Sequence, residues 1–207
     1  MKSRFSKERR ELVKSTCTLA GATALAFIGG SLNAFAAGGA MPLPQAKGAP
    51  VHGDTFVFTD GTKKGQPVLV TDIVLDAPPV TGAAVDPATG KIRDDDGDTE
   101  HATVLFYRVV PAKLQGDMKI DTADGVMAYS AVCTHLGCML TKWDAAAKQF
   151  VCPCHGATFD PQQEGENTGG PHSRTLPHVP LKAQADGKLE VSDQIVGWIG
   201  VKRGSFF

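Results

Sequence analysis

Short apolar runs, four to nine residues long and separated by glycine, proline or aspartate, recur along the chain after residue 50. Runs of this length with alternating or continuous apolar positions are typical of strands rather than helices. No pattern indicates a helix longer than three turns, and 23 glycines and 13 prolines favour many turns. The sequence therefore predicts an all-β fold, an antiparallel β sandwich. The expected strands are residues 55–59, 67–75, 102–110, 126–132, 148–151, 157–160 and 188–192.

Two segments between these strands are expected to be irregular. Residues 76–101 read as a polar insertion with several turn signals, and residues 111–114 as a short helical turn opened by a proline. The run D-D-D-G-D from Asp94 raises the possibility of a calcium loop. Its glycine stands at the wrong step for an EF-hand, and Leu105 occupies the position of the closing glutamate. We therefore expect a solvated loop.

The first 36 residues have the composition of a targeting segment. Basic residues end at Lys14, an apolar stretch follows, and A-F-A at residues 34–36 matches a cleavage pattern. The run R-R-E-L-V-K from Arg9 resembles a twin-arginine export signal. Residues 15–36 are also long enough to span a membrane, so a cleaved signal and a retained anchor both stay open. We expect a signal or anchor at 1–36, a flexible linker at 37–50 and one domain at 51–207.

Charge is distributed unevenly between the leader and the domain. The leader holds six basic and two acidic residues, which leaves 15 basic and 20 acidic residues in the remainder. The domain is therefore mildly acidic. This argues against nucleic acid as a partner and favours a basic protein partner.

Four of the five cysteines and two of the six histidines fall within 23 residues. The segment begins C-T-H-L-G-C at Cys133 and ends C-P-C-H at His155. Thiolate and imidazole are ligands of zinc, copper and iron–sulfur centres. A four-coordinate zinc site leaves two of the six residues unused, and two disulfides leave both histidines unexplained. A Rieske [2Fe–2S] centre uses two cysteines and two histidines and leaves two cysteines that could pair.

The segment contains two motifs, a first box at residues 133–138 and a second box at residues 152–155. These two boxes resemble the cluster-binding boxes of Rieske iron–sulfur proteins. They are most similar to the disulfide-containing branch, which occurs in cytochrome bc and bf complexes and in the small subunit of arsenite oxidase. The resemblance covers about residues 102–192. It implies the Rieske fold, with a small cluster-binding subdomain at about residues 131–175 inserted into the sandwich.

The resemblance also implies the cofactor, a Rieske [2Fe–2S] cluster, and its ligands. One iron would be held by two cysteines and the other by two histidines, with a disulfide between the loops. Gly137 and Gly156 would allow positive φ and close approach of the loops, and Pro153 would stiffen the second loop. The implied ligands are Cys133, Cys152, His135 and His155, and the implied disulfide joins Cys138 and Cys154.

Two features of the boxes bear on redox chemistry. By resemblance, His135 and His155 lie at the surface and couple one-electron transfer to movement of a proton. Relatives in bc complexes carry a serine and a tyrosine after the second box, where this chain has Ala157 and Phe159. Without those hydroxyls we expect a potential in the lower or middle part of the Rieske range, roughly −150 to +300 mV.

The resemblance implies an electron-transfer subunit rather than a stand-alone enzyme. The first expectation is the iron–sulfur subunit of a quinol-oxidising cytochrome bc-type complex, with a cytochrome b-type subunit as partner and a c-type cytochrome as electron acceptor. The alternative is the small subunit of a periplasmic arsenite-oxidase-like enzyme, beside a molybdenum catalytic subunit. We expect the periplasmic side of the bacterial inner membrane, reached in the folded state by the twin-arginine route, where a disulfide can persist.

Overall fold

The computed structural model describes residues 45–114, 118 and 121–201. The predicted leader at 1–36, with the twin-arginine run and Cys17, lies outside these residues, as does most of the predicted linker at 37–50. In the part of the chain that is described, no helix is long and apolar enough to cross a membrane.

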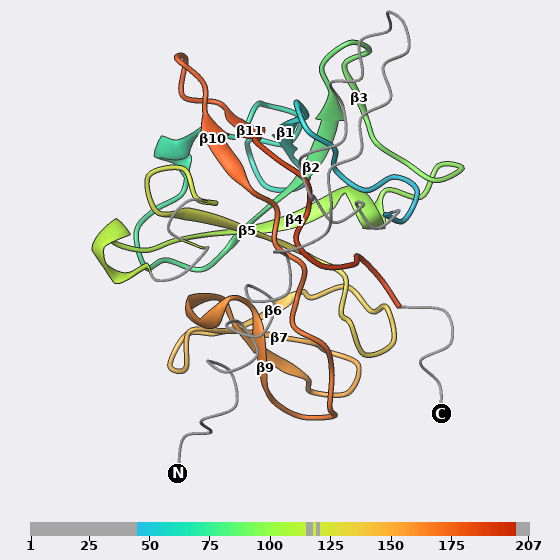
Figure 1. Cartoon of the computed structure of the whole chain (residues 1–207), viewed down its shortest axis with the longest axis vertical. Coiled ribbons are helices and arrows are strands. Elements are labelled where there is room, and N and C mark those ends of the chain that lie inside the picture. The colour runs from blue at the N-terminus through green and yellow to red at the C-terminus, as the bar shows by residue number, and fades with distance from the viewer. Residues whose placement is uncertain (1–44, 115–117, 119–120, 202–207) are drawn as a thin grey trace, which may run out of the picture. The chain divides into compact units, whose positions relative to one another are not determined.

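A seven-stranded antiparallel sheet forms the larger part of the domain (Figure 1). Its order is β10-β11-β1-β2-β4-β5, with the short β3 paired to β2. Val179, just before β10, donates its amide to the carbonyl of Ala128 in β5 at 2.8 Å. The two ends of the strand order, β10 and β5, therefore approach each other. The strands are β1 (Thr55–Phe58), β2 (Val80–Asp86), β3 (Lys91–Ile92), β4 (Thr103–Arg108), β5 (Val126–Ser130), β10 (Leu181–Ala183) and β11 (Leu189–Val191).

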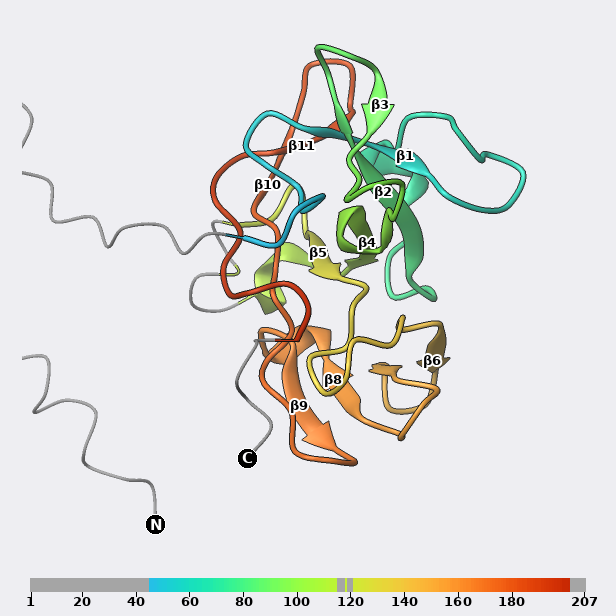
Figure 2. The ribbon, with the colours of Figure 1, turned by 90° about the vertical axis from the view of Figure 1, so that its right-hand side faces the viewer.

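A second antiparallel sheet of four strands, β6-β7-β8-β9, carries the two cysteine boxes at its edges and turns (Figure 2). It is inserted between β5 and β10, which agrees with the predicted subdomain. Its strands are β6 (Lys142–Asp144), β7 (Gln149–Val151), β8 (Thr158–Asp160) and β9 (Glu166–Gly169). Short 3₁₀ turns complete the described elements: η1 (Val70–Asp72), η2 (Glu100–Ala102), η3 (Pro111–Lys113) and η5 (Pro161–Gln163). The predicted all-β antiparallel architecture is confirmed.

Strands β4 and β5 are buried on both faces and join the two sheets. Alternate side chains such as Phe106 and Ala128 enter the core of the larger sheet, where Phe106 packs edge-on against Phe56. The side chains between them, such as Tyr129, face the opposite way and pack against Phe150 of β7. Because side chains alternate along a strand, one strand pair supplies both cores. This double burial fixes the small sheet against the large one.

The sequence prediction was wrong between residues 67 and 101. Residues 67–75 form isolated bridges and the turn η1 instead of a strand, since the Asp72 carboxylate accepts the Leu69 amide at 3.0 Å and closes a turn. The predicted insertion at 76–101 contains β2, which lies between β1 and β4. A Cβ at Gly82 of β2 would lie 2.9 Å from the Phe106 ring, so a small residue is required there. Because β2 consists largely of small residues, its sequence lacks the pattern of large apolar residues by which a strand is predicted.

Candidate metal centre

Two loops of the small subdomain fold by the same hydrogen-bond pattern. In the first, the amide of Gly137 donates to the carbonyl of Cys133 at 2.9 Å; in the second, Gly156 donates to Cys152 at 3.0 Å. In both loops the cysteine amide donates to the carbonyl five residues further on, at 2.8 Å. Each box is therefore a tight turn closed at its glycine, with its first cysteine at the base.

Of the two roles predicted for the glycines of the boxes, the structure shows positive φ but not close approach of the loops. Gly137 and Gly156 have φ of +83° and +73°, the left-handed region that glycine adopts without strain. The predicted crowding lies elsewhere, in a third loop, residues 170–174, which follows β9. A Cβ on Gly170, with φ of +75°, would lie 2.3 Å from the carbonyl oxygen of Gly156. The backbone of the third loop therefore passes directly over the second box.

The four cysteines divide into two pairs. Cys138 and Cys154 form a disulfide that joins the loops, which confirms the predicted pairing. Cys133 and Cys152 are free and buried, and their thiols contact each other across the two loops. Burial is the main cause that raises the pKa of the Cys133 thiol to about 11, so in the absence of a metal this thiol keeps its proton. A metal is the natural partner for two thiols buried side by side.

The histidines of the two boxes also meet. The rings of His135 and His155 lie 5.0 Å apart and nearly perpendicular, with His155 exposed and His135 half-buried. Nδ1 of His135 is buried and has no hydrogen-bond partner, a costly state for a polar atom. A bound iron would satisfy this nitrogen. Two free buried thiols and an unpartnered imidazole nitrogen fit a mixed cysteine and histidine cluster, and the four individual ligand assignments stay predictions.

A contact that the sequence did not indicate holds the third loop to the first box. The hydroxyl of Thr134 donates to the carbonyl of Arg174 at 2.5 Å, and the guanidinium of Arg174 donates to the carbonyls of Trp198 and Gly200 at 3.4 and 2.7 Å. These residues are 24 to 40 positions apart. No local pattern could have predicted their contact.

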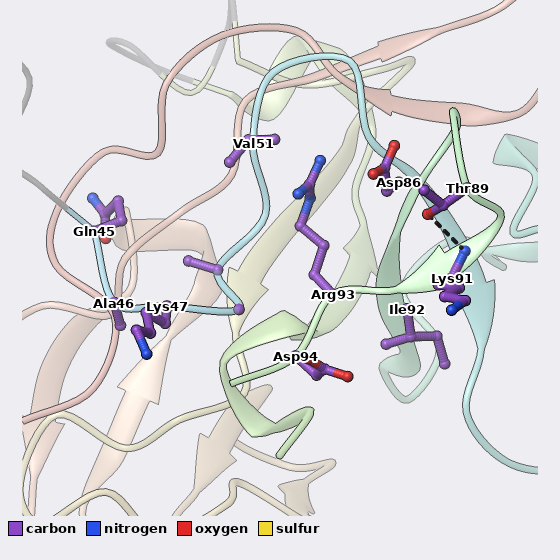
Figure 3. Close-up of a pocket in the computed structure, with 12 residues that line it drawn as sticks. Gln45, Ala46, Lys47, Val51, Asp86, Thr89, Lys91, Ile92, Arg93 and Asp94 are labelled. Atoms are coloured by element: carbon purple, nitrogen blue, oxygen red, sulfur yellow. Dashed lines mark hydrogen bonds between the residues drawn. The ribbon is translucent and has the colours of Figure 1, made fainter. Parts of the chain in front are cut away.

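Two cavities in the described part of the chain differ in their relation to the centre. One, of about 350 Å³, is lined by His135, Leu136, His172 and Arg174 and adjoins the first box. The larger, of about 650 Å³, lies between residues 45–51 and the β2–β3 hairpin, and its lining includes no cysteine or histidine (Figure 3).

Two charged groups of the larger cavity, Arg93 and Lys47, form ion pairs. Arg93 extends toward the loop that carries Val51 in Figure 3, and its guanidinium binds the buried Asp54 at 2.5 and 2.8 Å. Lys47 lies 3.3 Å from Asp95. The lining of this cavity contributes no cysteine or histidine to the centre, which rests on the two boxes.

Comparison with known proteins agrees with this geometry. The Rieske [2Fe-2S] domain family matches residues 96–180. A protein of Haloferax mediterranei, provisionally named as the Rieske subunit of a respiratory nitrate reductase, is 29% identical over 199 residues, which are 96% of this chain and 82% of that protein. The iron-sulfur subunit of the cytochrome b6-f complex of Chlorobaculum tepidum is 42% identical over 95 residues, 46% of this chain and 49% of that subunit.

Among solved structures, the plasma membrane Rieske protein of Synechocystis PCC 6803 is similar to 56% of this chain over 86% of its own, with 24% identity and a TM-score of 0.35. The match of residues 96–180 spans both boxes, the disulfide and the buried thiols. Residues 96–180 are therefore a Rieske [2Fe-2S] domain with a disulfide between its two cysteine boxes, and a [2Fe–2S] cluster is the cofactor of such a domain.

Proposed function

We propose that this Rieske electron-transfer subunit belongs to a quinol-oxidising cytochrome bc-type complex and delivers electrons to a c-type cytochrome. The cluster, when bound, supplies the one-electron chemistry. The observation that carries the proposal is the placement of the two histidines at the tips of the loops, where a redox partner can reach them. His155 is exposed, its ring is 5.0 Å from that of His135, and the neighbouring Leu136 side chain is 43% exposed.

The residues of the first box favour docking of a partner at this tip. Nδ1 of His135 is buried, which leaves Nε2 as the nitrogen that a partner can contact. The adjoining cavity of about 350 Å³ gives the partner a concave, partly apolar surface beside that ring. The similarity to the b6-f subunit covers 46% of this chain and supports a complex of this kind.

The location belongs to the same proposal. We infer that the domain works on the periplasmic side of the bacterial inner membrane and is exported folded through the twin-arginine signal at Arg9-Arg10. The disulfide supports this location, because disulfides persist outside the reducing cytoplasm. Proteomic detection of the mature N-terminus in membrane and periplasmic fractions would distinguish a retained anchor from a cleaved signal.

A second candidate is an electron-transfer subunit beside a molybdenum enzyme, as first expected for an arsenite-oxidase-like complex. The similarity to a protein named for a nitrate reductase, over 96% of this chain, favours it. Isolation of the native complex separates the two candidates. Quinol-dependent reduction of a c-type cytochrome, inhibited when the complex lacks this subunit, supports the first, and co-purifying molybdenum without a b-type haem supports the second.

Docking through the tip is tested by placing a charge on Leu136. In the intact complex, Leu136→Asp is expected to slow electron transfer at least about tenfold, because a carboxylate at a desolvated contact costs more than about 1.4 kcal/mol. Val74→Asp, at a 65% exposed side chain in the segment that follows η1, is the matched control. Both variants should keep the wild-type reduction potential. Equal rates for Leu136→Asp and wild type would contradict docking at this tip.

A further inference from the structure

An irregular segment after β11, residues 196–201, lies between residues 45–47 and the first box; we call it the strap. At its beginning, the amide of Val196 donates to the carbonyl of His178 at 3.0 Å, and the amide of His178 donates back at 3.1 Å. Further on, Ile199 is 1% exposed and enters the core of the large sheet. These two anchors give the strap a defined path without regular secondary structure.

Gln45 holds the strap with both ends of its side-chain amide. Nε2 of Gln45 donates to the carbonyl of Gly197 at 2.6 Å, and Oε1 accepts the amide of Ile199 at 3.3 Å. A glutamine side chain can donate and accept at once, so one residue binds two backbone groups of the strap. The two bonds join residues 152 and 154 positions apart.

The ring of His101 makes a second connection from the same segment to the strap. Its Nδ1 lies 3.1 Å from the carbonyl oxygen of Lys47, within hydrogen-bond distance. At the other ring nitrogen, a Cβ on Gly200 would lie 3.1 Å from Nε2, so the backbone of the strap passes directly beside the ring. Residues 45–47 are therefore tied to the strap at two places.

Arg174 connects the strap to the first box. Its guanidinium donates to the carbonyls of Trp198 and Gly200, the residues that alternate with those bound by Gln45. The carbonyl of Arg174 accepts the hydroxyl of Thr134, whose side chain is buried and which directly precedes His135. A continuous series of hydrogen bonds thus runs from residue 45 to the neighbour of a predicted ligand.

We propose that the strap couples residues 45–47 to the first box, and that Gln45 and Arg174 are positioning residues that hold His135 in place through it. Neither side chain has to touch the cluster, because each acts on the backbone of the strap. Energetic coupling between distant sites is carried by contiguous networks of this kind. A shift of residues 45–47 would therefore change the geometry of the first box. This inference goes beyond the proposed function and does not depend on which complex the protein serves.

The test measures amide hydrogen exchange of the intact, cluster-containing protein by mass spectrometry. Gln45→Ala is expected to make exchange in residues 133–140 about three to ten times faster, because lost hydrogen bonds favour local opening. Gln184→Ala is the matched control, since its Nε2 also donates at 2.6 Å, to Glu190 of β11. Exchange in β4 reports global unfolding and should not change. Wild-type exchange in residues 133–140 of Gln45→Ala, a gain no larger than that in β4, or an equal gain in the control would overturn the proposal.

Variants of Arg174 test the second half of the connection. Arg174→Met removes the donors to the strap; it should speed exchange in residues 133–140 and shift the g-values of the reduced centre in electron paramagnetic resonance. Arg174→Lys keeps a donor and should restore both in part. Unchanged g-values in Arg174→Met would contradict a positioning role toward His135.

A double variant tests whether the two side chains act through the same strap. Gln45→Ala with Arg174→Met should exchange no faster in residues 133–140 than the faster single variant, because either substitution already breaks the connection. If Arg174→Met does not take up iron, Arg174→Lys replaces it in this comparison. Effects of the two substitutions that multiply would show that they act independently, and would overturn the proposal.

Discussion

At the scale of single residues, Ala157 and Phe159 are important because they place apolar side chains, without hydroxyls, beside the second box. Both side chains are completely buried, and neither carries a hydroxyl. The amide of Cys152 donates to the carbonyl of Ala157 at 2.8 Å, so this alanine lies directly beside a predicted ligand. Hydrogen bonds to the sulfurs raise the potential of an iron–sulfur cluster. The lack of these two hydroxyls is the reason for the low or middle potential that we expect.

Restoring the hydroxyls should therefore raise the potential. Ala157→Ser and Phe159→Tyr are each expected to shift it upward by tens of millivolts, up to about 100 mV, because one hydrogen bond to a charged group contributes about 1.5–3 kcal/mol. Direct voltammetry on the purified protein measures the shift. Ala183→Ser, on an exposed position of β10, is the control and should leave the potential unchanged. Unchanged or lower potentials in both test variants would refute this account.

Gly170 is the residue at which backbone crowding decides the structure of the site. Gly170→Ala is expected to destabilise the domain and to lower the iron content per chain, since its Cβ would lie 2.3 Å from the Gly156 carbonyl oxygen. Gly90→Ala provides the matched control, because φ is also positive, at +68°, and nothing lies within 4 Å of its Cβ. The control should lose only about 1 kcal/mol. Equal melting temperatures and iron contents for the two variants would show that the third loop does not press on the second box.

At the scale of elements, β5 and the small sheet are held together by Tyr129. Its buried hydroxyl donates to the carbonyl of Pro161 in η5 at 2.7 Å, and its ring packs on Phe150 of β7. Burial is the main cause that raises the pKa of Tyr129 well above its ordinary value, so the hydroxyl stays a donor. Tyr129 thus connects a strand of the large sheet to two elements of the small one.

Removing that hydroxyl should loosen the junction. Tyr129→Phe leaves the carbonyl of Pro161 without this donor and is expected to cost about 1–3 kcal/mol of unfolding free energy. Tyr107→Phe, whose hydroxyl donates at 3.1 Å to the partly exposed Asp76, should cost less, because water can replace that bond. Urea unfolding of the two variants makes the comparison. A larger loss in Tyr107→Phe would contradict the role given to Tyr129.

Prediction from sequence succeeded where the chemistry is local. The boxes at Cys133 and Cys152 place thiols and imidazoles a few residues apart, so they could be identified without the fold. Strand β2 was missed because its sequence, V-T-G-A-A-V-D, consists largely of small residues. A small residue is needed at Gly82 because Phe106 of β4 packs against it. The bond from Thr134 to Arg174 joins residues 40 positions apart and has no local pattern. Tertiary contacts of this kind become visible only in the folded chain.

At the scale of the whole molecule, the two sheets have separate tasks. The seven-stranded sheet buries one core and supplies β4 and β5, on which the four-stranded sheet rests. The small sheet then needs only to present two short loops, a disulfide and a third loop that covers them. Because the site lies at the loop tips, the large sheet can vary without changing the chemistry.

The central claim is that one cluster is ligated unequally, by thiolates at one iron and by imidazoles at the other. Electron paramagnetic resonance of the reduced full-length protein, with Cys138–Cys154 intact, tests it most directly. We predict about two iron ions per chain and the low average g-value of mixed nitrogen and sulfur ligation. A spectrum with the higher average g-value of an all-thiolate cluster, or a protein with intact disulfide that contains zinc in place of iron, would contradict the account.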